Sequence, residues 1–141
     1  MIRWIGFLGS ALFVLTLVGC ICWPTRVEDA PLAPEEESRL EALLVGTWSA
    51  AAFEDRRGNI DENDPEHFLY HFQEDGTGRY DQNYMVTGRN PFRWELRGRN
   101  IHLFMERGGR ESVWRIDEYN QDSMRWFNYF DSGYFLMERQ Q

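Results

Sequence analysis

The sequence predicts an all-β fold, a meander of about eight antiparallel strands that curls around one apolar face. The first observation is that turn residues recur at intervals of roughly 10 to 13 residues, close to the spacing typical of meanders. They are Gly76, Gly88, Gly98, Gly108, the Asn120–Ser123 cluster and Gly133. The second observation is that apolar and polar residues alternate with a period of two between these turns. These runs are rich in aromatic and β-branched residues, which favour strands.

The strands expected from this pattern are residues 46–54, 67–73, 77–85, 91–97, 100–106, 111–118, 123–130 and 133–139. Alternate residues of a strand point to opposite faces of the sheet. The apolar residues of most strands share one parity, as Phe68, Tyr70 and Phe72 do, which predicts one dry face. The seventh strand is apolar on both parities. Its Phe127 and Tyr129 are therefore either covered on the outer face or part of an exposed aromatic patch.

The N-terminal residues form a separate segment. Arg3 is followed by an uncharged, apolar stretch that ends in Leu17-Val18-Gly19-Cys20. This order is typical of secretory signals, and the last four residues resemble the lipobox of bacterial lipoproteins. The resemblance implies that residues 1–19 are a cleaved signal peptide and that Cys20 carries lipid. The alternative is an uncleaved anchor over residues 4–23, since a spanning helix needs ~20 apolar residues.

Both alternatives place the rest of the chain in the cell envelope, because the positive Arg3 stays on the cytoplasmic side. The lipoprotein resemblance also bears on which membrane holds the anchor. Ile21 follows the cysteine, where Asp would imply inner-membrane retention in enterobacterial lipoproteins. By that analogy we expect an outer-membrane anchor and a domain that faces the periplasm. The uncleaved alternative implies an inner-membrane anchor with a periplasmic domain.

Residues 20–37 are expected to be the lipidated cysteine and a flexible linker. The stretch from Pro24 to Glu37 contains three prolines and five acidic residues, a composition that disfavours packing. As a random coil its ends would lie roughly 20 Å apart. We therefore expect the linker to hold the domain clear of the membrane.

A short helix is expected over residues 35–44, at the start of the domain that spans residues 38–141. Ser38 and Glu41 fit a capping box at its start. Three leucines at positions 40, 43 and 44 share one helical face. We expect this face to pack on the domain's own core.

The composition excludes several classes of function. The net charge is −8, with 23 acidic against 15 basic residues, so nucleic acid would repel the protein. All the basic residues are arginine, which excludes a Schiff-base lysine and a lysine-bearing phosphate loop. The two cysteines, Cys20 and Cys22, lie at the expected anchor and leave none for a disulfide in the domain. No nucleophile motif is present, and we expect neither enzyme activity nor a cofactor.

No metal site is expected either. His67, His71 and His102 lack the spacing of metal ligands, and we expect them to be solvated or packed at an edge. The acidic stretch Asp61–Glu66 lacks the spacing of a calcium loop and is expected to be solvated.

Two further motifs suggest a family. The first expected strand begins with Gly46-Thr47-Trp48, and the second turn reads Phe72-Gln73-Glu74-Asp75-Gly76-Thr77. They resemble the Gly-x-Trp start of lipocalins and a hairpin of bacterial lipocalin-like lipoprotein domains. The resemblance implies a single small up-and-down antiparallel β-barrel of about eight strands, preceded by a signal segment, a disordered linker and one short helix. It also implies a barrel floor of Gly46, Trp48 and Arg139, with the arginine lying across the indole.

The interior of an eight-stranded barrel holds its own side chains or one small ligand. The candidate cavity residues are Tyr70, Phe72, Trp94, Trp114 and Trp126, and these rings are also large enough to fill the barrel without a ligand. Tyr70, Tyr80 and Asn128 are possible polar anchors for a ligand. The expected function is binding of a small apolar ligand or lipid fragment. The alternative is a protein-interaction module, such as an envelope assembly factor or an enzyme inhibitor.

Overall fold

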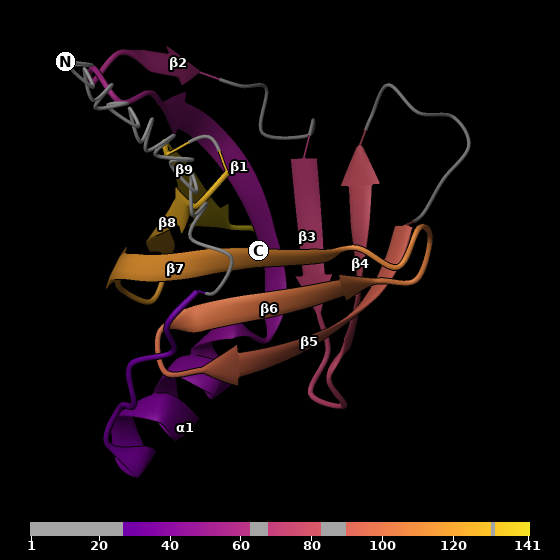
Figure 1. Cartoon of the computed structure of the whole chain (residues 1–141). Helices are drawn as coiled ribbons and strands as arrows, with labels where there is room; N and C mark the ends of the chain where they lie inside the picture. Colours follow the sequence, from indigo (N-terminus) through magenta and orange to yellow (C-terminus); the bar gives the residue numbers. More distant parts are fainter. Residues whose placement is uncertain (1–26, 63–67, 83–89, 131) are drawn as a thin grey trace, which may run out of the picture.

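The structure, a computed structural model, describes residues 27–62, 68–82, 90–130 and 132–141. The expected signal peptide, Cys20, Cys22 and His67 lie outside these ranges. The described chain contains one helix and nine strands (Figure 1). They are α1 (Pro34–Leu44), β1 (Gly46–Glu54), β2 (Ile60–Glu62), β3 (Phe68–Phe72), β4 (Thr77–Gln82), β5 (Asn90–Arg97), β6 (Asn100–Met105), β7 (Glu111–Tyr119), β8 (Ser123–Asn128) and β9 (Tyr134–Arg139).

The strands form a closed antiparallel barrel, which confirms the predicted fold class. From β3 to β9 each strand pairs with the next one in the chain, and β1 pairs with both β3 and β9. The β1–β9 ladder runs from Trp48 opposite Arg139 to Glu54 opposite Tyr134 and closes the sheet. The barrel therefore has eight strands, β1 and β3 to β9, connected up and down. Closure leaves the barrel without the free edges of an open sheet.

Strand β2 is an addition that the sequence pattern did not predict. It pairs with the second half of β1, through Ala52 opposite Glu62 and Glu54 opposite Ile60. All three residues of β2 are exposed, so the strand lacks the alternation of apolar and polar residues from which strands were predicted. Strand β2 is held by backbone pairing with the second half of β1, whereas β3 pairs with the first half.

Helix α1 covers one end of the barrel, the lower end in Figure 1. The helix itself was predicted, but the capping box was wrong. The N-cap is Ala33, which makes no side-chain capping bond, and Pro34 occupies the first turn, where its missing N–H costs little. Ser38 lies inside the helix instead. Within the described ranges, no helix is long and apolar enough to cross a membrane.

The expected flexible linker does not extend through residues 27–37. The Asn100 amide donates to the Glu28 carbonyl at 3.1 Å and to the Asp29 carboxylate at 2.8 Å. His102 Nε2 lies 2.9 Å from the same carboxylate. Polar pairing, which a search for apolar packing misses, thus holds this segment against the outer wall of β6. It also buries His102, which is 4% exposed, so of the two alternatives expected for the histidines the solvated one does not apply to His102.

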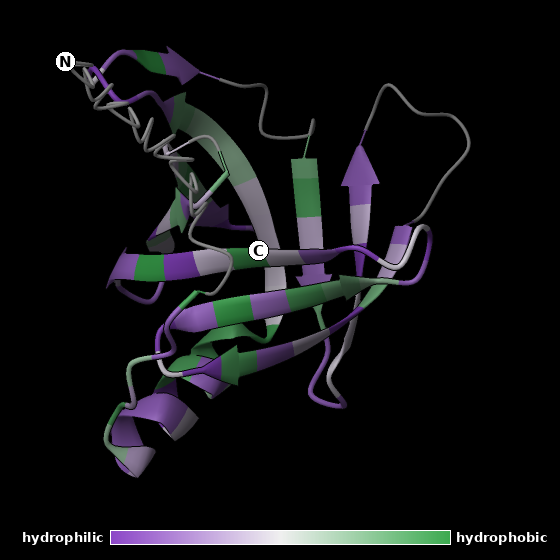
Figure 2. Ribbon diagram, viewed as in Figure 1, coloured by the Kyte–Doolittle hydropathy of each residue, from purple (hydrophilic) through white to green (hydrophobic). Residues whose placement is uncertain are grey.

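The core lies inside the barrel, and in the first part of β6, from Asn100 to Leu103, hydrophilic and hydrophobic residues alternate (Figure 2). Two irregularities change the parity of the inward face, between Ala50 and Ala52 in β1 and between Ile116 and Glu118 in β7. Such bulges add one residue to one strand. After the first of them Phe53 packs on Phe135, with ring centres 5.5 Å apart. The bulge thereby adds an aromatic ring to the interior that simple alternation from Trp48 would place outside.

Candidate functional site

The structure brings Gly46, Trp48 and Arg139 together at one end of the barrel, which we call the floor. The guanidinium of Arg139 lies 4.6 Å from the centre of the Trp48 ring. It also donates to the Val45 carbonyl at 3.1 Å and to the Leu43 carbonyl, which ties the end of α1 to the barrel. Gly46 makes room for this arginine, since a Cβ there would lie 2.7 Å from Arg139 Nη1. The floor therefore joins β9, β1 and the end of α1.

All five predicted cavity residues lie in the interior and form one network around Trp126. The Trp126 ring centre lies 5.6 Å from that of Tyr70, 5.9 Å from Phe72 and 6.3 Å from Trp114. Phe72 meets Trp94 edge to face at 5.4 Å. These spacings are those of favourable aromatic pairs.

Four of the five residues, Phe72, Trp94, Trp114 and Trp126, belong to the buried core, and Tyr70 packs against it. Phe72, Trp94 and Trp126 are all buried, and the Trp94 indole donates to the carbonyls of Gln73 and Thr77. Their polar and apolar groups are satisfied within the protein. This half of the interior is filled by its own side chains, as one of the two sequence alternatives expected.

The other half of the interior, at the end opposite α1, carries a second group of rings that we call the mouth rings. Trp114 and Phe135 lie 5.0 Å apart, Tyr70 and Tyr80 lie 4.9 Å apart, and Phe68 stacks on Tyr80 at 6.2 Å. All but Trp114 are half-buried, so part of their surface is accessible. The mouth rings are Phe53, Phe68, Tyr70, Tyr80, Trp114 and Phe135.

The mouth rings contain three hydrogen-bond donors without a partner among the described residues. Trp114 Nε1 is buried and unpaired there. No hydrogen bond found in these ranges involves the hydroxyl of Tyr70 or Tyr80. Burial raises the pKa of Tyr80 to about 12. Burial, with a smaller contribution from neighbouring Tyr80, raises the pKa of Tyr70 further above its ordinary value.

Asn128, the third possible anchor from the sequence, serves a turn instead. Its Oδ1 accepts a hydrogen bond from the backbone N–H of Phe130 at 2.8 Å. Two further rings of the site, Phe53 and Phe135, were not predicted from the sequence. Phe135 carries the inward parity of its strand, a signal that was available, whereas the position of Phe53 depends on the bulge in β1.

The outer face of β7 to β9 carries a separate group, the outer aromatic cluster of Phe127, Tyr129 and Tyr134. The Arg115 guanidinium lies 4.7 Å from the Phe127 ring centre, and that of Arg125 lies 3.6 Å from Tyr134. Both arginines also pair with carboxylates, Arg115 with Asp117 and Arg125 with Glu54. The protein's own arginines thus cover part of these rings, which answers the question left open for the seventh strand.

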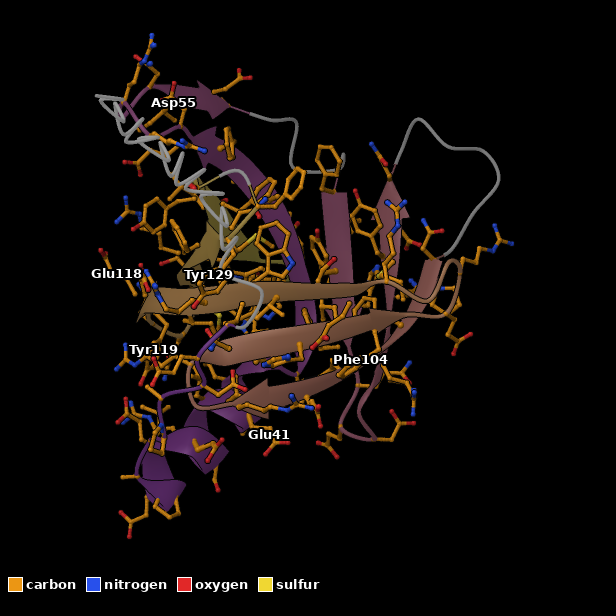
Figure 3. All side chains as sticks on the ribbon, in the orientation of Figure 1. Glu41, Asp55, Phe104, Glu118, Tyr119 and Tyr129 are labelled. Atoms are coloured by element: carbon orange, nitrogen blue, oxygen red, sulfur yellow. The ribbon has the colours of Figure 1, made fainter. Side chains whose placement is uncertain are left out.

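Charged side chains such as those of Glu41, Asp55 and Glu118 lie at the periphery of the molecule (Figure 3). His71 also lies on the outer face, 3.1 Å from Asp81, and burial lowers its pKa. Among the residues described, no group of three metal-ligating side chains is present. Only Asp61 and Glu62 of the acidic stretch fall in this part of the chain, both exposed in β2.

The described part of the molecule has surface hollows at both ends of the barrel. One, of about 430 Å³, is lined by Phe53, Asp55, Arg56 and Arg57 at the β1–β2 turn. Another, of about 410 Å³, lies across the floor-side ends of β7, β8 and β9. None of the five predicted cavity residues lines either hollow. The first nevertheless adjoins the mouth rings through Phe53.

Two solved structures share the fold. A lipocalin-like protein from Bacteroides uniformis matches with a TM-score of 0.56 at 15% sequence identity, over 70% of this chain and 99% of that one. An uncharacterized protein from Bacteroides eggerthii matches with a TM-score of 0.54 at 15% identity, over 68% of this chain and 98% of that one. The chain therefore has a lipocalin-like β-barrel fold. No family model matches the sequence, and no curated protein does.

Proposed function

We propose that the barrel binds one small apolar ligand or lipid fragment at the mouth rings. The observation that carries this proposal is the change in packing along the barrel. Phe72, Trp94 and Trp126 are buried beside the floor, whereas Phe68, Tyr80 and Phe135 at the other end keep accessible surface. Aromatic surface that water can reach gains roughly 25 cal/mol per Å² when an apolar molecule covers it. The lipocalin-like fold also supports a ligand-binding function.

Native mass spectrometry of the full chain, purified from the cells that make it, tests this function. We expect one small molecule to remain bound and to be released on collisional activation. Phe135→Ala and Tyr80→Ala should lose it. Phe127→Ala is the matched control, because it removes a half-buried ring from the outer aromatic cluster. A wild-type protein that carries no molecule, and that takes up no apolar probe afterwards, would refute the proposal.

We further propose that the protein is an envelope lipoprotein anchored at Cys20, which rests on the sequence Leu17-Val18-Gly19-Cys20. Metabolic labelling with palmitate should label the wild type but not Cys20→Ser. The labelled protein should fractionate with the outer membrane. Recovery of an unlabelled, uncleaved chain from the inner membrane would instead favour the anchor over residues 4–23.

A protein-interaction module is the second candidate function, and one observation favours it. Phe130 is 90% exposed and Ile60 is 59% exposed, and both lie on turns or strands near the mouth. A photo-crosslinking amino acid at position 130 should give one discrete protein adduct in cells if this function is correct. The control position for the crosslinking amino acid is Arg107, which is exposed on the β6–β7 turn at the same end of the barrel. Equal labelling at both positions would count against a specific partner.

A further inference from the structure

We infer that the ligand is a neutral molecule with a flat apolar body and one hydrogen-bond acceptor, such as a carbonyl oxygen, received by Trp114 Nε1. This inference rests on the proposed binding function and specifies the chemistry of its ligand. Three features of the mouth rings support it. They are the unpaired donor, the two phenols that no charged side chain of the described residues perturbs, and the ring geometry.

The first feature is the unpaired indole N–H of Trp114. The side chain is 9% exposed, between Phe135 at 5.0 Å and Trp126 at 6.3 Å. Its Nε1 is the single buried side-chain polar atom of the described residues that lacks a hydrogen-bond partner. A buried, unsatisfied donor costs about 1–3 kcal/mol. A hydrogen-bond acceptor of the ligand at this atom would recover that free energy. The site therefore favours molecules that carry a hydrogen-bond acceptor.

The second feature is that no charged side chain of the described residues perturbs the two phenols. The pKa of Tyr80 is raised by burial alone, and that of Tyr70 by burial and by Tyr80. Each of the arginine–ring contacts found involves Trp48, Tyr119 or the outer aromatic cluster. A carboxylate placed beside the Tyr70 and Tyr80 hydroxyls would lose its hydration without gaining a counter-ion among the described residues, which is strongly unfavourable. The acceptor is therefore neutral.

The third feature is the arrangement of the rings. Phe68 and Tyr80 are nearly parallel, with an interplanar angle of 13°, and Tyr70 tilts from Tyr80 by 36°. Aromatic rings in these orientations offer faces and edges to a flat partner, which favours offset stacking and edge contacts. An aromatic or otherwise planar body fits such a surface better than a flexible acyl chain does.

Three probes with the same ring system separate these features. They are 2-acetylnaphthalene with a neutral acceptor, 2-ethylnaphthalene without one, and 2-naphthoate with a charged one. Binding to the full chain in detergent is followed by quenching of tryptophan fluorescence. We expect the ketone to bind about 5- to 30-fold more tightly than the ethyl compound, as one hydrogen bond to a buried donor implies. We expect 2-naphthoate to bind most weakly.

The variant that tests the donor is Trp114→Phe, which should abolish the preference for the ketone over 2-ethylnaphthalene, measured as the ratio of the two affinities. Trp94→Phe is the matched control, because the Trp94 indole already donates to two backbone carbonyls. It should keep the preference. Should Trp114→Phe fail to fold, the indole resonance of Trp114 in the wild type gives a second measurement, and it should shift with the ketone alone.

The outcomes separate the two proposals. If none of the three probes binds the wild type, the proposed function fails. If all bind equally, or if 2-naphthoate binds most tightly, the binding function stands and the ligand class is wrong. Retention of the ketone preference in Trp114→Phe, or no indole shift with the ketone, overturns the role of Trp114.

Discussion

The guanidinium of Arg139 lies 4.6 Å from the centre of the Trp48 ring while it donates to backbone carbonyls near the end of α1. One side chain thus joins the last strand, the first strand and the helix. A cation over an indole contributes about 0.5–2 kcal/mol, and hydrogen bonds from a charged donor about 1.5–3 kcal/mol each. These contributions overlap and part of the side chain is solvated, so their sum is smaller than the separate values suggest.

We therefore expect Arg139→Ala to lower the free energy of unfolding by about 2–4 kcal/mol, as measured by urea denaturation. The exposed Arg107 provides the control, and Arg107→Ala should change stability by less than about 0.5 kcal/mol. Equal effects of the two substitutions would show that the floor contact contributes nothing specific.

Gly78 is required by the close approach of Phe92. A Cβ at residue 78 would lie 2.3 Å from Phe92 Cε2 and 2.5 Å from the His71 carbonyl oxygen. Gly78→Ala should cost at least about 1–3 kcal/mol of stability, the range for overpacking. Gly108→Ala is the comparison, because it meets no atom within 4 Å and bears only the strain of its φ of +86°.

A double-mutant cycle checks the cause of the Gly78 effect. Phe92→Leu should recover part of the loss in the Gly78→Ala background, since it removes the ring edge that the Cβ would meet. Strict additivity of the two substitutions would contradict the proposed clash.

Asp29 holds the segment before α1 against the barrel. Burial opposes its ionisation, but hydrogen bonds from Asn100 and His102 outweigh burial and lower its pKa. Asp29→Ala should accelerate hydrogen exchange in residues 27–33 and cost about 1–3 kcal/mol, because His102 Nε2 loses its partner. Glu28→Ala is the control, since the Glu28 contact with Asn100 is made by its backbone carbonyl. Unchanged exchange in Asp29→Ala would contradict this role.

The pH dependence of this contact follows from the lowered pKa of Asp29. The stabilisation is present above the ordinary carboxyl pKa of ~4 and is lost as the pH falls through the lowered value. Lowering the pH should therefore accelerate hydrogen exchange in residues 27–33 more in the wild type than in Asp29→Ala.

Alkaline pH should lower the free energy of unfolding through Tyr80, one of the mouth rings. The folded pKa of Tyr80, about 12, lies above the ordinary value near 10, so the neutral phenol is favoured by folding. This stabilisation is complete below pH ~10 and is lost as the pH rises toward 12. Tyr80→Phe should flatten that part of the curve of unfolding free energy against pH. Ionisation of all six tyrosines near pH 10 in the folded protein, followed by absorbance, would be the contrary result.

The sequence predicted the barrel because its signals are local. Alternation within a strand, as in Phe68, Tyr70 and Phe72, and glycines at turns such as Gly76 each act over a few residues. The helix was found from its leucine spacing, while its start was misassigned because Pro34 serves there in place of a capping side chain.

The features that the sequence did not predict depend on contacts between residues that are far apart in the sequence. Asp29 and His102 are 73 positions apart, and neither has a local pattern that indicates the other. The bulge beside Ala50 arises from pairing with β9 and moves Phe53 into the interior, so parity counted along the sequence fails beyond it. The five candidate cavity residues lie inside the barrel. Which of them are packed, and which keep an unpaired donor, depends on neighbours from other strands.

The docking of Glu28 and Asp29 on the barrel wall changes how the domain would sit on a membrane. An acylated Cys20 would be joined to the immobilised chain by only seven residues, which span at most about 25 Å when fully stretched. Such a short tether would restrict the domain to a thin layer next to the headgroups and allow little rotation. The barrel would then encounter molecules that leave the bilayer more readily than those dissolved far from it.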